Sequence, residues 1–241
     1  PLLLDWNNAG KHLKSWGYEV DENLSDASCL EIIRFLNDWK EKINPLYLMV
    51  SLPPTFAYPA HDATSKILKE AVIPFCRDSG LPLALMIGVK RAVNPDLQLA
   101  GDGLGRADLV ALENLCAENL DVKFLCTVLS RENQQELCVI GRKFRNLHIF
   151  GCWWFTNIPS IIDEMTRLRM ELLGTSFTAQ HSDARVLDQV IYKWDHSRQI
   201  MTDVLTDKYT DLTQTGWSLT DQAIQRDVNN LLGASFEAFC R

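Results

Sequence analysis

Several features that would mark a particular class of protein are missing from this sequence. Its seven cysteines are an odd set without a C-x-x-C pair, and several lie inside apolar runs. That pattern indicates buried free thiols in a reducing compartment and not a disulfide framework or a zinc knuckle. No apolar run approaches the roughly 20 residues of a membrane span, and the first residues lack the basic start of a signal peptide. We therefore expect a cytoplasmic protein without a membrane partner.

An excess of basic charge is also missing. The formal net charge is -7 and the basic residues are scattered, which argues against nucleic acid as a partner and favours a small molecule. With 241 residues, 46% of them hydrophobic, and no low-complexity linker, the chain is expected to form one domain, 1–241.

Hydrophobic periodicity predicts helices and strands in alternation. Apolar runs indicate strands, and amphipathic spacing indicates the helices between them. The expected strands are 46–52, 83–89, 123–130, 147–151 and 175–179. The expected helices are 28–43, 63–78, 109–119, 132–144, 158–173, 186–206 and 220–239. This order predicts an α/β fold with a parallel sheet covered by helices, either a barrel or an open doubly wound sheet.

Two observations favour the barrel. Glycines 101, 103 and 105 lie well after their strand in a long loop, which we interpret as loop flexibility and not as a phosphate-binding turn. Polar and aromatic residues follow the strands at their carboxyl ends, where a barrel carries its chemistry. Five strands are too few for an eight-stranded barrel, so about three strand-helix units are expected to be missing on the amino-terminal side.

The candidate site lies after the last two expected strands. Trp153 and Trp154 should point to opposite faces if they continue a strand, so at most one packs against a ligand while the other joins the helix layer. For either tryptophan taken singly, packing in the core is the expected role. Asp183 and Arg185, two residues apart on an extended segment, should point to the same side. Asp183 can act as a base and Arg185 can bind an anion. An ordinary ion pair between them, with Ser182 or Asp183 capping the following helix, explains the same residues.

Other polar residues near strand ends carry weaker signals. Lys90, Arg91 and Arg131 could each bind an anionic ligand or be solvated at the surface, and Lys90 is preferred because it comes first beyond its strand. His181 is interpreted as a structural histidine, since no second His or Cys sits at metal-ligand spacing.

Several segments together resemble one known family. The run Phe-Gly-Cys-Trp-Trp-Phe at 150–155, the helix after it, Leu-Gly-Thr at 173–175 and Ser-Asp-Ala-Arg at 182–185 resemble the carboxyl half of uronate isomerases. In that family a Trp-Trp-Phe segment precedes Thr-Asp-Ser-Arg. The resemblance extends along essentially the whole chain and is strongest to the divergent bacillus-type branch.

The resemblance implies a fold and a reaction. The family belongs to the amidohydrolase superfamily and forms a distorted (β/α)8 barrel, of which this chain would carry strands four to eight and a terminal helical extension. It interconverts D-glucuronate with D-fructuronate, and D-galacturonate with D-tagaturonate. By likeness, Asp183 would be the metal ligand and acid/base group, Arg185 the anion partner, and Trp153, Trp154 and Lys90 would bind the uronic acid substrate.

A divalent metal, zinc by likeness, would take its histidine ligands from the missing amino-terminal part. A homo-oligomer is expected, and the 241-residue segment alone is expected to be inactive and poorly soluble. Met86 occupies the position of a histidine in the family's Gln-Leu-His-Ile-Gly segment, and thioether is a poor zinc ligand. Residues 193–197 replace the family's Arg-His-Glu-Tyr-Phe and are expected on an outer helix. The alternatives are a metal-dependent hydrolase of the same superfamily, and a non-catalytic barrel fragment or assembly subunit.

Overall fold

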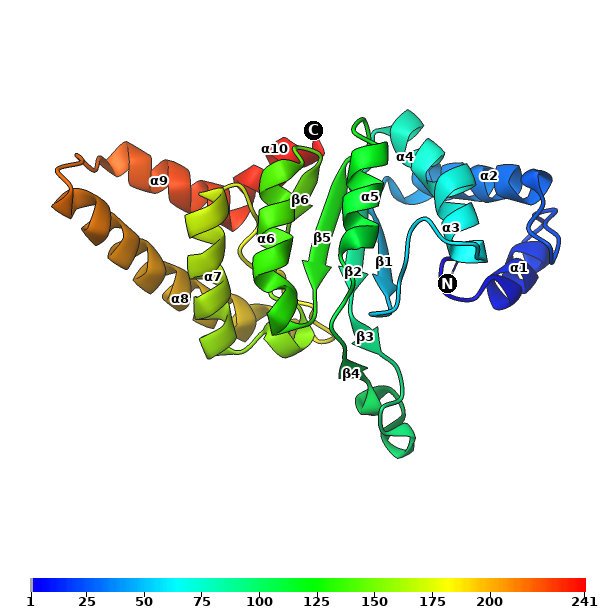
Figure 1. Cartoon of the computed structure of the whole chain (residues 1–241), viewed down its shortest axis with the longest axis horizontal. Helices are drawn as coiled ribbons and strands as arrows, with labels where there is room; N and C mark the ends of the chain where they lie inside the picture. Colours follow the sequence, from blue (N-terminus) through cyan, green and yellow to red (C-terminus); the bar gives the residue numbers. More distant parts are fainter. Residues whose placement is uncertain (1) are drawn as a thin grey trace.

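The computed structural model describes residues 2–241, which form a four-stranded parallel sheet with helices packed on it (Figure 1). The strands are β1 (Leu48–Leu52), β2 (Leu83–Ile87), β5 (Phe124–Val128) and β6 (Leu147–Ile149). They pair in the order β1-β2-β5-β6, which is also their order in the sequence. The predicted α/β class with a parallel sheet is confirmed. Within residues 2–241 the sheet stays open and does not close into a barrel.

The helices that connect the strands lie on one face of the sheet. They are the continuous run of α3 (Ala63–Ile67), the π-helical turn η1 (Leu68–Val72) and α4 (Ile73–Ser79), then α5 (Val110–Glu118), η3 (Arg131–Asn133) with α6 (Gln134–Lys143), and α7 (Pro159–Leu173). Parallel strands in sequential order, joined by right-handed crossovers, place every connecting helix on the same side. Figure 1 shows α5, α6 and α7 over that face.

The remaining elements flank this core. The amino-terminal part contains α1 (Trp6–Ser15) and α2 (Asp26–Ile43). The chain after β6 contains η4 (Trp154–Thr156), the long helix α8 (Leu187–Gln214), α9 (Asp221–Asn229), η5 (Asn230–Ala234) and α10 (Ser235–Cys240). None of the helices in residues 2–241 is long and apolar enough to cross a membrane.

Each face of the sheet has its own hydrophobic core, because successive side chains of a strand point to opposite faces. Leu85 and Cys126 point to the helices and belong to the larger core. Met86 and Leu125 point to the opposite side, which we call the inner face. Helix α10 packs Phe236 and other aromatic groups against the inner-face core, so the end of the chain covers part of that face.

Two of the predicted elements differ from the structure. The fifth predicted strand, 175–179, is reduced to one parallel bridge between Phe150 and Thr178. The predicted final helix, 220–239, is broken at Gly233, whose φ is 143°. Helix α1 was not predicted, although Asp5 caps it by accepting a hydrogen bond from the backbone N–H of Asn8.

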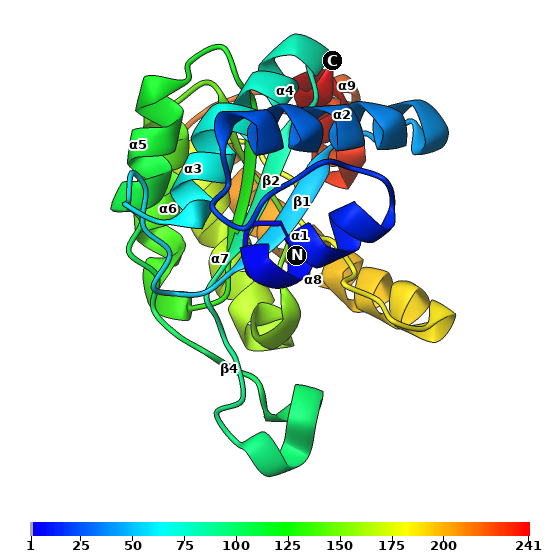
Figure 2. The same ribbon diagram turned by 90° about the vertical axis from the view of Figure 1, so that its right-hand side faces the viewer.

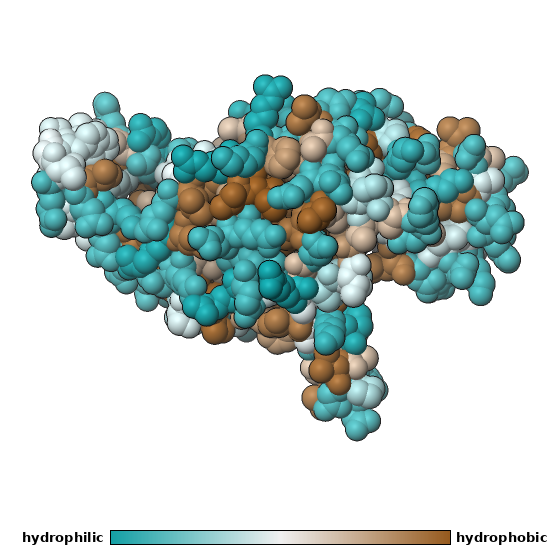
Figure 3. Space-filling view, viewed as in Figure 1, coloured by the Kyte–Doolittle hydropathy of each residue, from teal (hydrophilic) through white to brown (hydrophobic). Residues whose placement is uncertain are grey.

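A projecting arm follows β2. It comprises β3 (Val89–Lys90), η2 (Pro95–Gly101) and β4 (Gly103–Leu104), and it extends away from the sheet in both views (Figures 1 and 2). The interpretation of its glycines as loop flexibility is wrong. A Cβ atom at Gly101 would overlap the carbonyl oxygen of Asn94, and one at Gly105 would lie 2.6 Å from Pro54 Cγ. These glycines allow close backbone packing, and hydrophobic groups are exposed on the arm (Figure 3).

Candidate active site

A cavity of about 510 Å³ opens on the inner face of the sheet. Met86, Leu125 and Phe236 are part of its apolar wall, and Thr178 and residues 181–183 form its polar part. The apolar groups come from the strands, from residues next to them and from α10, whereas the polar groups are Thr178, which forms the bridge to Phe150, and the segment that follows it. An apolar pocket with a few convergent polar groups is typical of a small-molecule site.

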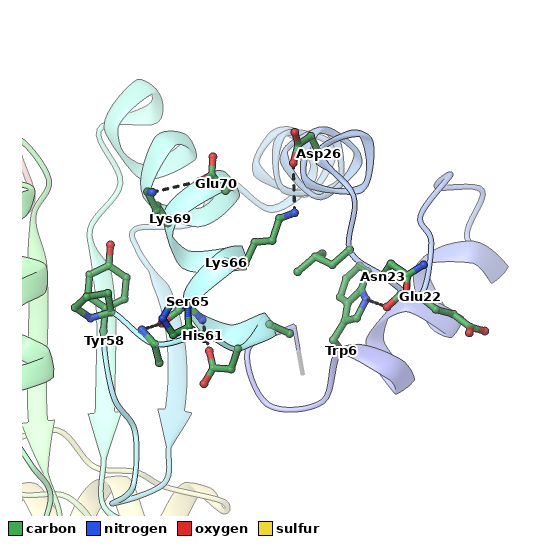
Figure 4. A pocket seen from close by; sticks show the side chains of 15 residues that line it. Trp6, Glu22, Asn23, Asp26, Tyr58, His61, Ser65, Lys66, Lys69 and Glu70 are labelled. Carbon is green, nitrogen blue, oxygen red and sulfur yellow. Dashed lines mark hydrogen bonds and ion pairs between the residues drawn. The ribbon is translucent and has the colours of Figure 1, made fainter.

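A larger cavity, of about 800 Å³, lies between the unit formed by α1 and α2 and the helix α3 (Figure 4). Charged groups around it pair with one another: Lys66 Nζ is 3.3 Å from Asp26 Oδ1, and Lys69 Nζ is 3.8 Å from Glu70 Oε1. The residues that the sequence singled out for a site do not line it. The inner-face cavity is therefore the stronger candidate.

Asp183 lines the inner-face cavity in an uncommon backbone conformation. Its φ is 44°, the left-handed region, so the segment around it is a turn. We expected Asp183 and Arg185 to share one side of an extended segment. That expectation is wrong, because the segment is not extended at Asp183. Asp183 is exposed as a residue, but loss of hydration around its carboxyl group raises the pKa of Asp183, while the Lys193 ammonium, the Arg185 guanidinium and the Trp153 indole lower it. A raised pKa makes the carboxylate a stronger base.

Arg185 is exposed next to this turn. Within residues 2–241 its guanidinium makes no ion pair. The backbone N–H of Ala92 and the Arg91 guanidinium lower the pKa of Asp102 in the arm, and the Arg185 charge adds a smaller effect in the same direction. The alternative of an Asp183–Arg185 ion pair that caps the next helix is wrong. Helix α8 begins at Leu187, and its N-cap residue Val186 makes no side-chain capping bond.

Both tryptophans lie on the inner side of the sheet. Strand β6 ends at Ile149, so they do not continue a strand, and Trp154 begins the turn η4 with a φ of 43°. Trp153 is 4% exposed in the inner-face core, and the partly buried Trp154 packs against the same core. The prediction that one tryptophan joins the helix layer is therefore wrong. The core role considered for Trp153 is confirmed.

The three cations considered as anion-binding groups lie at the surface. Lys90 is exposed on β3, where its backbone pairs with Gly103 of β4, and it does not line the inner-face cavity. Arg91 pairs with Asp102 in the arm, and Arg131 Nε lies 2.9 Å from Glu164 Oε2. None of the three lines the inner-face cavity, and substrate binding by Lys90 stays a prediction.

His181 is a residue whose role the sequence did not reveal. It lines the cavity, and its ring centroid is 5.2 Å from that of Phe150. Its Nε2 atom is buried and has no hydrogen-bond partner within residues 2–241, so the interpretation as a satisfied structural histidine is wrong. Burial lowers the pKa of His181 to about 4, and the charges of Arg169 and Lys193 add to this effect.

A buried arginine fixes the backbone beneath His181. Arg169 of α7 is 1% exposed, and its Nη1 donates to the carbonyl oxygen of Gly151 over 2.8 Å. Its Nη2 donates to Gln134 Oε1 over 3.3 Å, which ties α7 to α6. The sequence signal for this residue is its spacing, since Arg169 follows the buried Met165 by four positions on one helix face.

The described residues do not form a complete metal site. Within residues 2–241 no group of three His, Cys, Asp or Glu side chains is placed to hold a metal ion. Met86 stands on the inner face, and Asp183 supplies the one carboxylate of the cavity wall. A metal ion there would need ligands in addition to those of the described residues.

Comparisons with known proteins point to one family. No family model matches the chain, and no curated protein does either. Among solved structures, a uronate isomerase from Bacillus halodurans C-125 is 50% identical with a TM-score of 0.97, over 100% of this chain and 57% of that one. A uronate isomerase from Thermotoga maritima is 15% identical with a TM-score of 0.80, over 98% of this chain and 58% of that one. A glucuronate isomerase from Caulobacter crescentus is 15% identical with a TM-score of 0.69, over 89% and 50% respectively.

The fold and the cavity define an α/β protein with a candidate small-molecule site on the inner face of a parallel sheet. The two structures at 15% identity agree with this fold. At 50% identity over its whole length, the chain belongs to the uronate isomerase family, and it spans 57% of the length of the Bacillus halodurans protein. The resemblance seen in the sequence is thereby confirmed.

Proposed function

We propose that the complete protein is an intramolecular aldose-ketose isomerase that interconverts D-glucuronate with D-fructuronate and D-galacturonate with D-tagaturonate. The observation that carries this proposal is the 50% identity to a uronate isomerase, together with the cavity that places Asp183 against an apolar wall. The alternative is a metal-dependent hydrolase of the same superfamily, and the 50% identity to a uronate isomerase favours the isomerase over it. We further propose that the complete protein is cytoplasmic and homo-oligomeric.

We propose that the open sheet is a sector of a (β/α)8 barrel of the amidohydrolase superfamily. Its strands are parallel and sequential, and the connecting helices cover one face, which is the arrangement of a barrel wall. On this proposal β1, β2, β5 and β6 are strands four to seven, and the segment 175–179 is strand eight. Residues 1–241 then form the carboxyl-terminal portion of one barrel domain, with a terminal helical extension.

The proposed reaction moves a proton between two adjacent carbons. Asp183 takes the proton from C2 of the open-chain aldose, and an enediol forms as O1 gains a proton. The O2 hydroxyl then gives up its proton, which replaces the one that O1 took, while Asp183 returns the first proton to C1 to give the ketose. Arg185 stabilises the negative charge that develops on the substrate oxygens. Trp153, Trp154 and Lys90 are proposed to bind the sugar acid, with Trp153 acting from the core beneath the cavity.

We also propose a divalent metal, zinc by family likeness, with Asp183 as one ligand and histidines beyond the described residues as the others. The residues described here do not fit a complete site, so the proton transfer above is written without the metal. Zinc would supply Lewis acidity at the substrate oxygens.

The test is turnover of each uronate by the complete protein, followed by proton NMR. Asp183→Asn removes the base and should lower kcat by about 10² to 10⁴-fold. Asp188→Asn is the matched control, because Asp188 is an exposed acid in the first turn of α8 and does not line the cavity. Unchanged kcat in Asp183→Asn would remove the proposed role of this residue.

A further inference from the structure

The turn that carries Asp183 needs support from outside itself. A non-glycine residue in the left-handed region costs about 1 to 3 kcal/mol, and such a conformation persists only where neighbouring groups fix it. Asp183 has a φ of 44° and belongs to neither a helix nor a strand. The groups that hold this turn therefore decide where its carboxylate points.

Helix α8 supplies two hydrogen bonds that bracket Asp183. Lys193 Nζ donates to the carbonyl oxygen of Ser182, the residue before Asp183, over 2.7 Å. The backbone N–H of Arg185, two residues after Asp183, donates to Gln189 Oε1 over 2.8 Å. One bond thus fixes the turn before the carboxylate, and the other fixes it after.

The donor Lys193 and the acceptor Gln189 come from one surface of α8. Gln189 and Lys193 are four residues apart, so their side chains lie on the same face of the helix. The two amino-terminal turns of α8 thereby contact the edge of the cavity, and α8 then runs away from the sheet (Figure 1). The expectation that residues 193–197 belong only to an outer helix does not fit Lys193.

We propose that Gln189 and Lys193 form a two-point clamp that positions Asp183 and Arg185 for proton transfer. They are positioning residues, because their contacts in the structure are to the backbone of the turn and not to reacting atoms. The inference rests on the proposed isomerase function. A displacement of about 1 Å at a reacting group can cost about 100-fold in rate, so a loose clamp should lower kcat more than it changes KM.

The kinetic test uses the complete protein with D-glucuronate. Lys193→Met and Gln189→Ala should each lower kcat by about 10 to 100-fold and change KM by less than about threefold. Lys193→Arg keeps a cationic donor and should recover kcat to within about threefold of the wild type. Lys208→Met is the matched control, because Lys208 lies about 22 Å further along the same helix and pairs with Glu171. That control should keep the wild-type kcat.

A second measurement does not depend on turnover. Hydrogen exchange of the Arg185 amide should accelerate by about fivefold in Gln189→Ala, because a net hydrogen bond of about 1 kcal/mol is lost. It should not accelerate in Lys208→Met. If the wild type fails to isomerise any uronate but the amide responds in this way, the proposed function fails and the clamp stands as a structural device.

Three results would each overturn the clamp. The first is an Arg185 amide that exchanges at the wild-type rate in Gln189→Ala. The second, in an active enzyme, is a Lys193→Met variant with the kcat of the Lys208→Met control. A Lys193→Arg variant as impaired as Lys193→Met would also contradict the proposal, because it would show that donation to Ser182 is not what matters.

Discussion

Replacing Gly151 with alanine should displace the segment that carries His181 and Asp183. Gly151 has a φ of 65°, and a Cβ atom there would overlap His181 Cδ2 and lie 2.9 Å from the His181 backbone nitrogen. The left-handed backbone adds about 1 to 2 kcal/mol for alanine, and overpacking against a fixed backbone atom adds about 1 to 3 kcal/mol. Gly151→Ala should therefore lower the free energy of unfolding by about 2 to 5 kcal/mol.

Gly80→Ala separates the two contributions. Gly80 has a φ of 71° at the end of α4, and a Cβ atom there would meet nothing within 4 Å. Gly80→Ala should therefore lower the free energy of unfolding only by the cost of the left-handed backbone, about 1 to 2 kcal/mol. Urea unfolding of both variants of the complete protein measures the difference. If Gly151→Ala is no less stable than Gly80→Ala, the close packing of His181 on Gly151 does not constrain the site.

Two further predictions concern the inner face. Burial and Arg169 lower the pKa of His148 from 6.5 to about 4, so the folded protein binds fewer protons than the unfolded chain between these values. The free energy of unfolding should then fall by about 2 kcal/mol from pH 7 to pH 5 because of His148. Urea titrations at the two pH values should show a smaller fall in the His148→Gln variant. An equal fall in the variant would show that His148 is not the group responsible. Phe236→Ala removes edge contacts with Tyr47 and His148 and should lower the free energy of unfolding by about 2 kcal/mol. An unchanged urea midpoint would show that packing of Phe236 on the inner face does not stabilise the fold.

The sheet and its helices could be predicted because their signals are local. Strand β2 is a run of five buried apolar residues, and it comes shortly after Gly80, which ends helix α4. A short apolar run after a helix-ending glycine predicts a strand from local sequence alone. The segment 175–179 was also predicted as a strand but pairs through Thr178 alone. Strand pairing depends on the neighbouring chain, here the short β6, and no local pattern reports the neighbour's length.

The candidate site could be predicted only in part. Asp183 was singled out because it follows a predicted strand and matches the aspartate of the family's Thr-Asp-Ser-Arg segment, and it does line the cavity. Its left-handed φ could not be predicted, since aspartate occurs in both extended and turn conformations. The contacts of Lys193 and Gln189 depend on that turn, so they could not be predicted either.

The burial of Arg169 beside the site could not be predicted for a different reason. Arg169 is charged, and charged residues are almost never fully buried unless paired, so composition places it at the surface. It reaches the interior because the carbonyl oxygen of Gly151 and the amide of Gln134 accept its hydrogen bonds. Only the assembled ends of β6 and α6 bring these acceptors together.

Turnover of D-glucuronate by the complete protein is the most direct test of the proposed chemistry. We expect the wild type to form D-fructuronate, and Asp183→Asn to lower kcat by about 10² to 10⁴-fold with its fold intact. Asp183 lies in the turn beside the cavity, so the change removes the proposed base without opening a core position. A folded wild-type protein that isomerises no uronate, or an Asp183→Asn variant with wild-type kcat, would contradict it.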